Sequence, residues 1–189
     1  MAFPNSSGDV LTAADLNALP GLVFISTKTV SSGTTVSWNG DIDGSKFEHY
    51  KIVGSIDNIT GASNILCRVL SGGTPRTTGY LWGGFLSYTG AAILNAYQGG
   101  GSTASWRVSV SDGSATYGNL PFEVELWSLP NSSVASSFRS AGFNPVVPFP
   151  YFTQVGGTRT SVAADDGVQI NLDGAVTADI TASLYGYNQ

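Results

Sequence analysis

The sequence contains little charge, with 11% Asp, Glu, Lys and Arg against the roughly 25% of an average domain. Eight basic and 13 acidic residues give a formal net charge of −5, and no segment gathers basic side chains. Proteins that bind nucleic acid neutralise its phosphates with Lys and Arg. We therefore expect no nucleic-acid partner.

Cysteine and histidine occur once each, as Cys67 and His49. One cysteine cannot form an internal disulfide, and its apolar setting between Ile65 and Leu70 predicts a buried structural thiol. One histidine and one cysteine supply too few ligands for an ordinary zinc site within one chain, so we expect no metal and no cofactor. A symmetric oligomer could still bring copies of His49 together around its axis.

Long hydrophobic runs are missing as well. No apolar segment approaches the roughly 20 residues that a membrane-spanning helix needs. The first residues also lack the basic region and the apolar segment of a signal peptide. We expect neither membrane insertion nor export by a standard signal.

Helical patterning is confined to residues 12–19, with Thr12 as the N-cap, Asp15 at the third helical position and Pro20 and Gly21 as the stop. A helix of two turns is marginal in water, so we expect it to dock on another surface. That surface is either the protein's own sheet or another subunit. Residues 1–21 are therefore predicted to form an N-terminal arm with a short helix.

Strand-forming segments follow one another from residue 22 onward, separated by turn clusters rich in Gly, Ser, Asn and Asp. A turn every ten residues or so is typical of a sandwich or barrel. We predict an all-β fold, an antiparallel jelly-roll-like β-sandwich over residues 22–189. The predicted strands are 22–30, 34–38, 47–55, 64–70, 78–87, 105–110, 122–127, 133–141 and a terminal hairpin.

The terminal hairpin is predicted from strict alternation over residues 167–187, divided by a turn at Asp173 and Gly174. Its apolar positions would share one face in each arm: Val168, Ile170 and Leu172, then Val176, Ala178, Ile180, Ala182 and Leu184. A different segment, residues 142–152, contains three prolines and several aromatic rings. Because proline removes ladder donors, we expect it to be an edge segment or an extended contact surface.

Catalytic patterns are weak. Glu123 and Glu125 would share one strand face with Cα atoms about 7 Å apart, a spacing that could serve glycoside cleavage. The alternating Phe122, Val124 and Leu126 instead favour an ordinary polar-out, apolar-in strand. His49 could act as the base of a Ser-His-Asp arrangement, but no Gly-x-Ser-x-Gly elbow is present. We predict that the protein is not an enzyme and has no catalytic residues.

Carboxylates beside glycines form a further candidate site, at Asp41, Asp43, Asp165 and Asp166. A loop counted from Asn39 reaches Tyr50 at the twelfth position, where a calcium loop needs an acid, so the EF-hand match fails. Calcium in another loop geometry stays open, although turn chemistry explains these residues better. The glycines at 83–84 and 99–101 lack the Lys-Ser/Thr ending of a phosphate loop and indicate tight turns or close backbone approach.

Aromatic residues are the remaining candidates for ligand contact. Tyr80, Trp82, Phe85, Tyr88, Tyr97 and Trp106 could form a platform on which sugars stack, provided that some rings are exposed. Packing in the core is the alternative for each ring. The positions predicted to contact a ligand are Tyr80, Trp82, Tyr88, Tyr97 and Trp106.

Several segments in order resemble small virion proteins of tailed bacteriophages: Ala14-Asp-Leu-Asn-Ala-Leu19, Gly21-Leu-Val-Phe-Ile-Ser26, Phe47-Glu-His-Tyr-Lys-Ile-Val53 and the closing strand that ends Tyr-Gly-Tyr-Asn188. In such proteins an arm precedes a β-sandwich, and they include tail fibres, head fibres and capsid decoration proteins. This chain has Glu48 and His49 where that family often has Asp-Asn, which puts a shared ligand site in doubt.

The resemblance implies a non-catalytic structural protein that is made in the bacterial cytoplasm, located in the virion and assembled as a homotrimer. Its arm would bind a capsid or tail protein, and its sandwich could contact a glycan on the host surface. A capsid decoration protein and a lectin-like carbohydrate-binding module are the alternatives. The attaching side chains of the arm would be Phe3, Val10, Leu11, Leu16 and Leu19.

Overall fold

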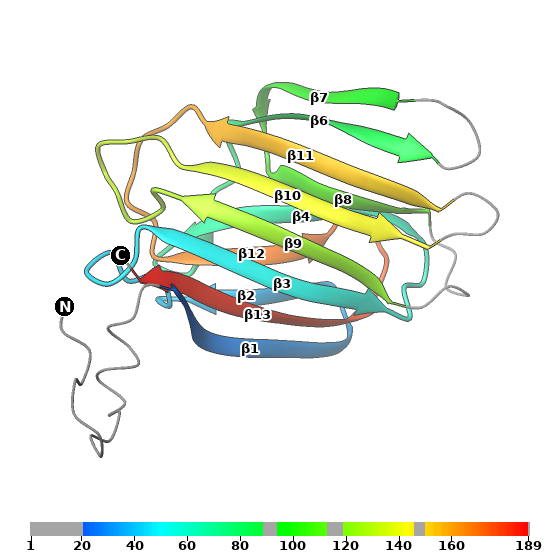
Figure 1. Cartoon of the computed structure of the whole chain (residues 1–189), viewed down its shortest axis with the longest axis horizontal. Helices are drawn as coiled ribbons and strands as arrows, with labels where there is room; N and C mark the ends of the chain where they lie inside the picture. Colours follow the sequence, from blue (N-terminus) through cyan, green and yellow to red (C-terminus); the bar gives the residue numbers. More distant parts are fainter. Residues whose placement is uncertain (1–20, 89–93, 113–118, 146–149, 189) are drawn as a thin grey trace, which may run out of the picture.

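The computed structural model describes residues 21–88, 94–112, 119–145 and 150–188, and these residues form strands and no helix (Figure 1). The all-β prediction is confirmed. The predicted helix and the rest of the arm, residues 1–20, lie outside the described residues. The strands are β1 (Gly21–Gly33), β2 (Thr35–Asn39), β3 (His49–Asp57), β4 (Ala62–Ser71), β5 (Thr74–Pro75), β6 (Tyr80–Tyr88), β7 (Leu94–Thr103), β8 (Trp106–Asp112), β9 (Leu120–Trp127), β10 (Ser137–Asn144), β11 (Tyr151–Arg159), β12 (Gly167–Leu172) and β13 (Ala178–Asn188).

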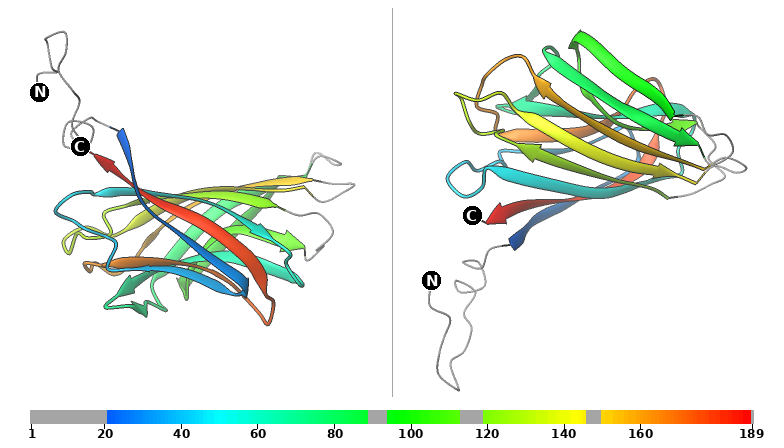
Figure 2. Two further views of the ribbon diagram at one scale, coloured as in Figure 1. Left: turned by 90° about the horizontal axis from the view of Figure 1, so that it is seen from below. Right: turned by 45° about the horizontal axis from the view of Figure 1, so that its top comes forward.

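These strands form two antiparallel sheets that stack as a sandwich (Figures 1 and 2). The larger sheet has eight strands in the order β1-β13-β3-β9-β10-β11-β6-β7. The smaller has the order β2-β12-β4-β5, and β8 also pairs with β4. The start of β1 pairs with the end of β13, since Gly21 lies opposite Asn188.

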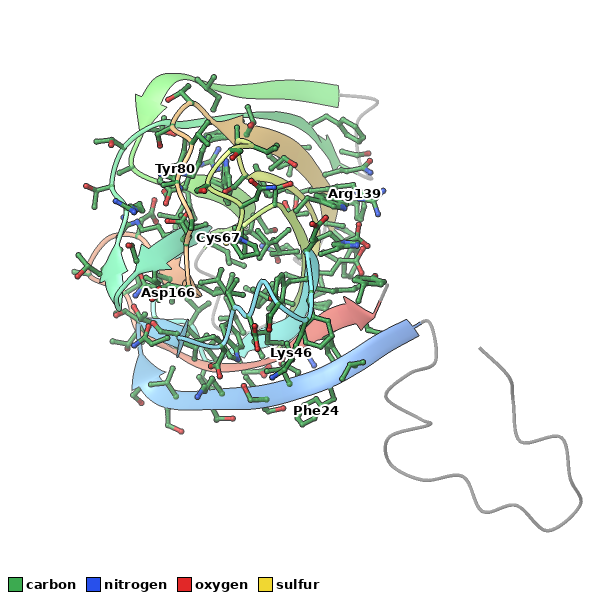
Figure 3. All side chains as sticks on the ribbon, turned by 90° about the vertical axis from the view of Figure 1, so that its left-hand side faces the viewer. Phe24, Lys46, Cys67, Tyr80, Arg139 and Asp166 are labelled. Atoms are coloured by element: carbon green, nitrogen blue, oxygen red, sulfur yellow. The ribbon has the colours of Figure 1, made fainter. Side chains whose placement is uncertain are left out.

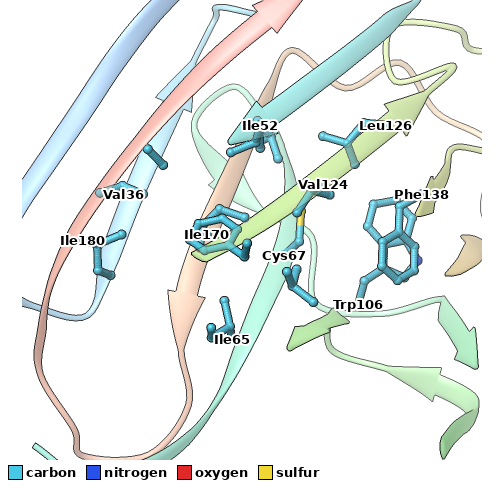
Figure 4. Close-up of a cluster of buried hydrophobic side chains, with 14 of the residues drawn as sticks. Val36, Ile52, Ile65, Cys67, Trp106, Val124, Leu126, Phe138, Ile170 and Ile180 are labelled. Atoms are coloured by element: carbon cyan, nitrogen blue, oxygen red, sulfur yellow. The ribbon is translucent and has the colours of Figure 1, made fainter. Parts of the chain in front are cut away.

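Alternation of side chains builds the core between the sheets. In β9, Phe122, Val124 and Leu126 are buried, while Glu123 and Glu125 point to the opposite face, as the period of two predicts. Figure 4 shows Val124 and Leu126 of the large sheet beside side chains of the small sheet. Cys67 on β4 is fully buried in this layer, so the prediction of a buried thiol is confirmed.

The predicted terminal hairpin is wrong. β12 pairs with β2 and β4 in the small sheet, whereas β13 pairs with β1 and β3 in the large sheet. Residues 173–177 therefore cross from one sheet to the other, and the side chain of Asp173 accepts hydrogen bonds from Ser63 and the backbone of Asn64. Both arms do turn their alternating apolar side chains into the core, but from opposite sides of it.

Two strands, β7 and β11, were not predicted from the sequence, and each contains adjacent glycines. β7 contains the glycines at 99–101, and β11 contains Gly156 and Gly157. β11 lies in the middle of the large sheet, between β10 and β6. Gly157 fits there because a Cβ at this position would come within 2.1 Å of the carbonyl oxygen of Leu81. Close backbone approach, rather than a turn, therefore explains this glycine.

Candidate binding face

The outer face of the large sheet, which is turned away from the small sheet, carries most of the exposed apolar surface. In the described residues eight large hydrophobic side chains are exposed, and six of them lie on strands of this sheet. These six are Leu22, Phe24, Val53, Phe85, Phe143 and Phe152. Figure 3 shows the arrangement from the end of the sandwich, with Arg139 on the outside of the large sheet and Cys67 between the sheets. We call this surface the binding face.

The first part of the binding face is an aromatic stack of Trp127, His49 and Tyr187. The ring of His49 lies between the other two, with centroid distances of 4.7 Å to Trp127 and 3.9 Å to Tyr187 and interplanar angles of 18° and 8°. The three residues come from β9, β3 and β13, which are consecutive in the sheet. Because neighbouring strands lie about 4.8 Å apart, rings that point outward from them stack at this spacing.

The surroundings of His49 in this stack disfavour its charged form. Burial between the rings lowers the pKa of His49 below its usual value of 6.5, although the nearby Glu125 carboxylate acts in the opposite direction. The Nε2 atom of His49 is also buried and has no hydrogen-bond partner in the described residues. The histidine therefore acts as an aromatic ring rather than as a free base.

The second part is a row of ion pairs beside the stack. The Lys51 ammonium lies 2.8 Å from a Glu123 oxygen and 3.9 Å from a Glu125 oxygen, and the Arg139 guanidinium lies 2.6 Å from the other Glu125 oxygen. Hydrogen bonding to Glu123 raises the pKa of Lys51. Both carboxylates of the suspected acid/base pair are thus matched by cations, in line with the polar-out interpretation.

The third part is an apolar groove of about 260 Å³ farther along the strands. Val53 stands on one side of it, and Phe143 and Phe152, which are direct cross-strand partners, stand on the other. The small Ala141, which is the cross-strand partner of Glu123, also lines it. Other lining residues are Gly54, Pro121, Phe122, Glu123 and Gly142. We call this feature the phenylalanine groove.

Two of the predicted ligand contacts are wrong, because Tyr80 and Trp106 have no exposed surface. The Tyr80 hydroxyl donates to the Arg76 carbonyl and accepts from the Val69 amide. Trp106 stacks on Phe138 with a centroid distance of 4.8 Å, and its ring N–H donates to the Thr158 carbonyl. These two rings pack in the core, and not on the surface, because β6 and β8 direct them into the space between the two sheets.

The other predicted contacts are not gathered into a platform in the described residues. Trp82 is half-buried against the core, with the Arg107 guanidinium 5.4 Å from its ring centre. Tyr88 and Tyr97 belong to β6 and β7, but their side chains lie outside the described residues, as do the arm residues Phe3, Val10, Leu11, Leu16 and Leu19. Phe85, considered with this group, is exposed on the binding face.

The acidic turn residues are occupied by turn and ion-pair contacts. Hydrogen bonds from the Ser45 side chain and from Lys46 lower the pKa of Asp43 to about 2. Asp165 pairs with Arg159 and Arg76, and Asp166 accepts from the Gly72 amide. Asp41 lines a separate cavity of about 700 Å³ between β1 and residues 40–47. Within the described ranges, no three His, Cys, Asp or Glu side chains gather as metal ligands do.

Sequence reasoning missed the residues that dominate the binding face. Trp127 and Tyr187 were assigned to strands without a role, and Phe143 and Phe152 appeared only within the proline-rich contact segment. The available signal was aromatic or aliphatic residues at the outward positions of strands whose inward positions are already apolar.

No protein-family model, curated protein or solved structure matches the chain. The described part of the chain has no helix that is long and apolar enough to cross a membrane.

Proposed function

We propose that this protein is a non-catalytic structural component of a tailed-phage particle. In this proposal its N-terminal arm, residues 1–21, anchors it to a capsid or tail protein. Its jelly-roll-like sandwich projects as a fibre or knob that contacts a glycan on the host surface, and the assembly is a homotrimer. The proposal depends on the sequence resemblance and on the binding face together.

The observation that carries the proposal is the composition of the binding face. Aromatic and aliphatic side chains are exposed on it. Its central charged residues form ion pairs with one another: Lys51 with Glu123, and Arg139 with Glu125. Large exposed apolar patches on soluble proteins are typical of interaction surfaces. A surface of this kind supports a protein that works by contact with other molecules.

The strands that carry much of the resemblance also carry the aromatic stack. Residues 47–53 and 176–187 include most of β3 and β13, which are neighbours in the sheet with Lys51 opposite Tyr185. His49, where the family often has Asn, is the central ring of the stack. The position at which this chain departs from the family therefore lies on the surface proposed to bind.

A glycan is the ligand that suits the aromatic stack. Trp and Tyr rings present an apolar surface with a polar tip, and sugars offer apolar C–H faces beside hydroxyls. Trp127 and Tyr187 form the two ends of the stack, so each keeps one ring face that His49 does not cover. Trp127→Ala is expected to reduce binding of the labelled protein to host cells, while Val134→Ala, which changes an exposed residue outside the binding face, preserves it.

The location in the particle is tested by immunogold labelling of purified virions with antibody against residues 22–189. Label at the tail or at fibre tips supports host recognition. Label over the whole head would instead support the capsid decoration alternative. Absence of label from particles would overturn the virion proposal, and glycan binding by the isolated protein would then favour the lectin-like alternative.

A further inference from the structure

The cavity between β1 and residues 40–47 takes no part in the binding proposed above, and we call it the edge cavity. Its volume is about 700 Å³, within the range of roughly 300–1,000 Å³ that small-ligand pockets occupy. It lies beside β1, the strand at one edge of the large sheet, whereas the aromatic stack comes from β9, β3 and β13. The edge cavity is therefore a second candidate site with its own lining.

The two sides of the edge cavity differ in chemistry. Among the described lining residues, β1 contributes only apolar side chains, those of Val23, Phe24 and Ile25. Phe24 is 59% exposed, the largest value for any large hydrophobic residue in the described ranges. Figure 3 shows Phe24 on β1 and Lys46 on the segment next to it. That segment contributes two carboxylates, a hydroxyl and an ammonium, from Asp41, Asp43, Ser45 and Lys46.

Hydrogen bonds hold the polar side of the edge cavity in place. The Asp43 carboxylate accepts from the Ser45 amide at 3.0 Å and from the Ser45 hydroxyl at 2.6 Å, and it pairs with the Lys46 ammonium at 2.9 Å. The Ile42 amide donates to the carbonyl of Asp166 at 3.2 Å, which ties the segment to the chain just before β12. A site that is formed before its ligand arrives loses less conformational freedom on binding.

An aromatic ring also anchors this segment to the core. Phe47 lines the edge cavity, and its ring lies 5.9 Å from that of Tyr50 in an edge-to-face contact. The ring packs against β13 at Gly186, where an added Cβ would come within 2.4 Å of it. The wall of the cavity is thus continuous with the folded core.

Asp41 is the group that this network leaves over. Its side chain is half-buried and lines the edge cavity, and in the described residues it makes no hydrogen bond and no ion pair. A carboxylate in this position can accept hydrogen bonds from a ligand without first giving up a partner in the protein.

These groups restrict the chemistry of the ligand. A wholly apolar ligand would cover the Asp41 carboxylate without a partner, which is costly. An anion would meet two carboxylates and one ammonium. A neutral sugar ring suits both sides, because its hydroxyls can donate to the carboxylates and accept from Lys46 while its C–H face lies on Phe24.

We infer that the edge cavity binds a pyranose ring of a neutral glycan, with Asp41 as hydrogen-bond acceptor and Phe24 as the apolar surface. This inference goes beyond the proposed function, which assigns glycan contact to the aromatic stack. It also does not depend on where the protein lies in a particle, because the purified full chain is sufficient to test it.

The first test is an NMR titration of the full chain with glucose, galactose, mannose, rhamnose and N-acetylglucosamine in turn. We expect at least one of these sugars to shift the amide signals of residues 23–25 and 40–47. Asp41→Ala and Phe24→Ala should each weaken that sugar roughly tenfold, the loss expected for one hydrogen bond to a charged group or one comparable contact. The matched control is Glu48→Gln, which changes an exposed side chain on the same segment and should keep the wild-type affinity.

The second test separates the edge cavity from the aromatic stack. Trp127→Ala is expected to leave the sugar-induced shifts at residues 40–47 unchanged. If it abolishes them while Asp41→Ala keeps them, the sugar binds the stack alone, which overturns this inference and supports the proposed function. Loss of host-cell contact in Trp127→Ala has no bearing on the edge cavity.

A third titration, with choline, examines the charge of the ligand. Choline brings a cation and apolar methyl groups but no ring of hydroxyls, so we expect it to bind more weakly than the preferred sugar. Shifts at residues 23–25 and 40–47 with choline and with none of the sugars would overturn the inference, because Asp41 would then serve a cation. Absence of shifts there with every sugar would overturn it as well.

Discussion

The guanidinium of Arg159 is paired with the carboxylate of Asp165, and the two side chains are only 3% and 0% exposed. A second cation, Arg76, approaches the same carboxylate at 3.2 Å. Removing one member of a buried ion pair leaves the other charge without compensation. The pair joins the end of β11 to the segment that leads into β12.

Asp165→Asn is therefore expected to lower the free energy of unfolding by about 3–5 kcal/mol, the range for a broken buried pair. Urea denaturation followed by tryptophan fluorescence measures the change. The control is Lys46→Ala, which removes the cation of an exposed pair with Asp43 and should leave the transition near that of the wild type. Equal shifts in the two variants would show that burial does not govern these pairs.

Gly54 lies where the large sheet has no room for a side chain. A Cβ at this position would come within 2.7 Å of both the Ala182 Cβ and the Phe122 Cζ. Gly54→Ala should therefore destabilise the fold by about 1–3 kcal/mol through overpacking. Gly21→Ala is the matched control, since a Cβ there meets nothing within 4 Å. Thermal unfolding of both variants and the wild type measures the effect. An unchanged melting temperature for Gly54→Ala would contradict the predicted overpacking.

The aromatic stack makes stability depend on pH through His49. The pKa of His49 in the folded protein lies below its usual value of 6.5. At pH values between these two pKa values, the unfolded chain therefore binds more protons than the folded chain. The free energy of unfolding must then fall as the pH decreases through this window. The stability that depends on uncharged His49 is fully present above pH 6.5, the usual pKa of histidine, and is lost as the pH falls below it.

A His49→Asn variant should lose this part of the pH dependence. Urea titrations of both proteins at several pH values between 5 and 8 are the measurement, and the difference between their slopes isolates His49 from the carboxylates. Identical slopes for the two proteins would show that the stack does not hold the ring neutral.

Cys67 provides a test of the core. It is fully buried, and burial raises the pKa of its thiol. We expect no reaction with a thiol reagent such as DTNB in native buffer and one equivalent after unfolding in guanidinium chloride. Rapid labelling of the native protein would mean that the core opens far more readily than its packing indicates.

Individual residues show how far the sequence leads. The alternation in β9 predicted that Glu123 and Glu125 point outward, and their ion pairs with Lys51 and Arg139 lie on that face. The same reasoning could not separate Tyr80 and Trp106, which are in the core, from Phe85, which is exposed. An aromatic ring suits either side of a strand, so its type does not determine its side.

The sequence by itself determined the all-β class, the buried thiol and the inward positions of most strands, because the period of two is a local property of the chain. Only the tertiary structure decided that β12 and β13 belong to different sheets and that β11 lies in the middle of the large one. Periodicity states which side of a strand is buried, but it says nothing of which strand lies next to it. For the same reason, the meeting of His49, Trp127 and Tyr187, and of Val53, Phe143 and Phe152, became visible only once the strand order was known.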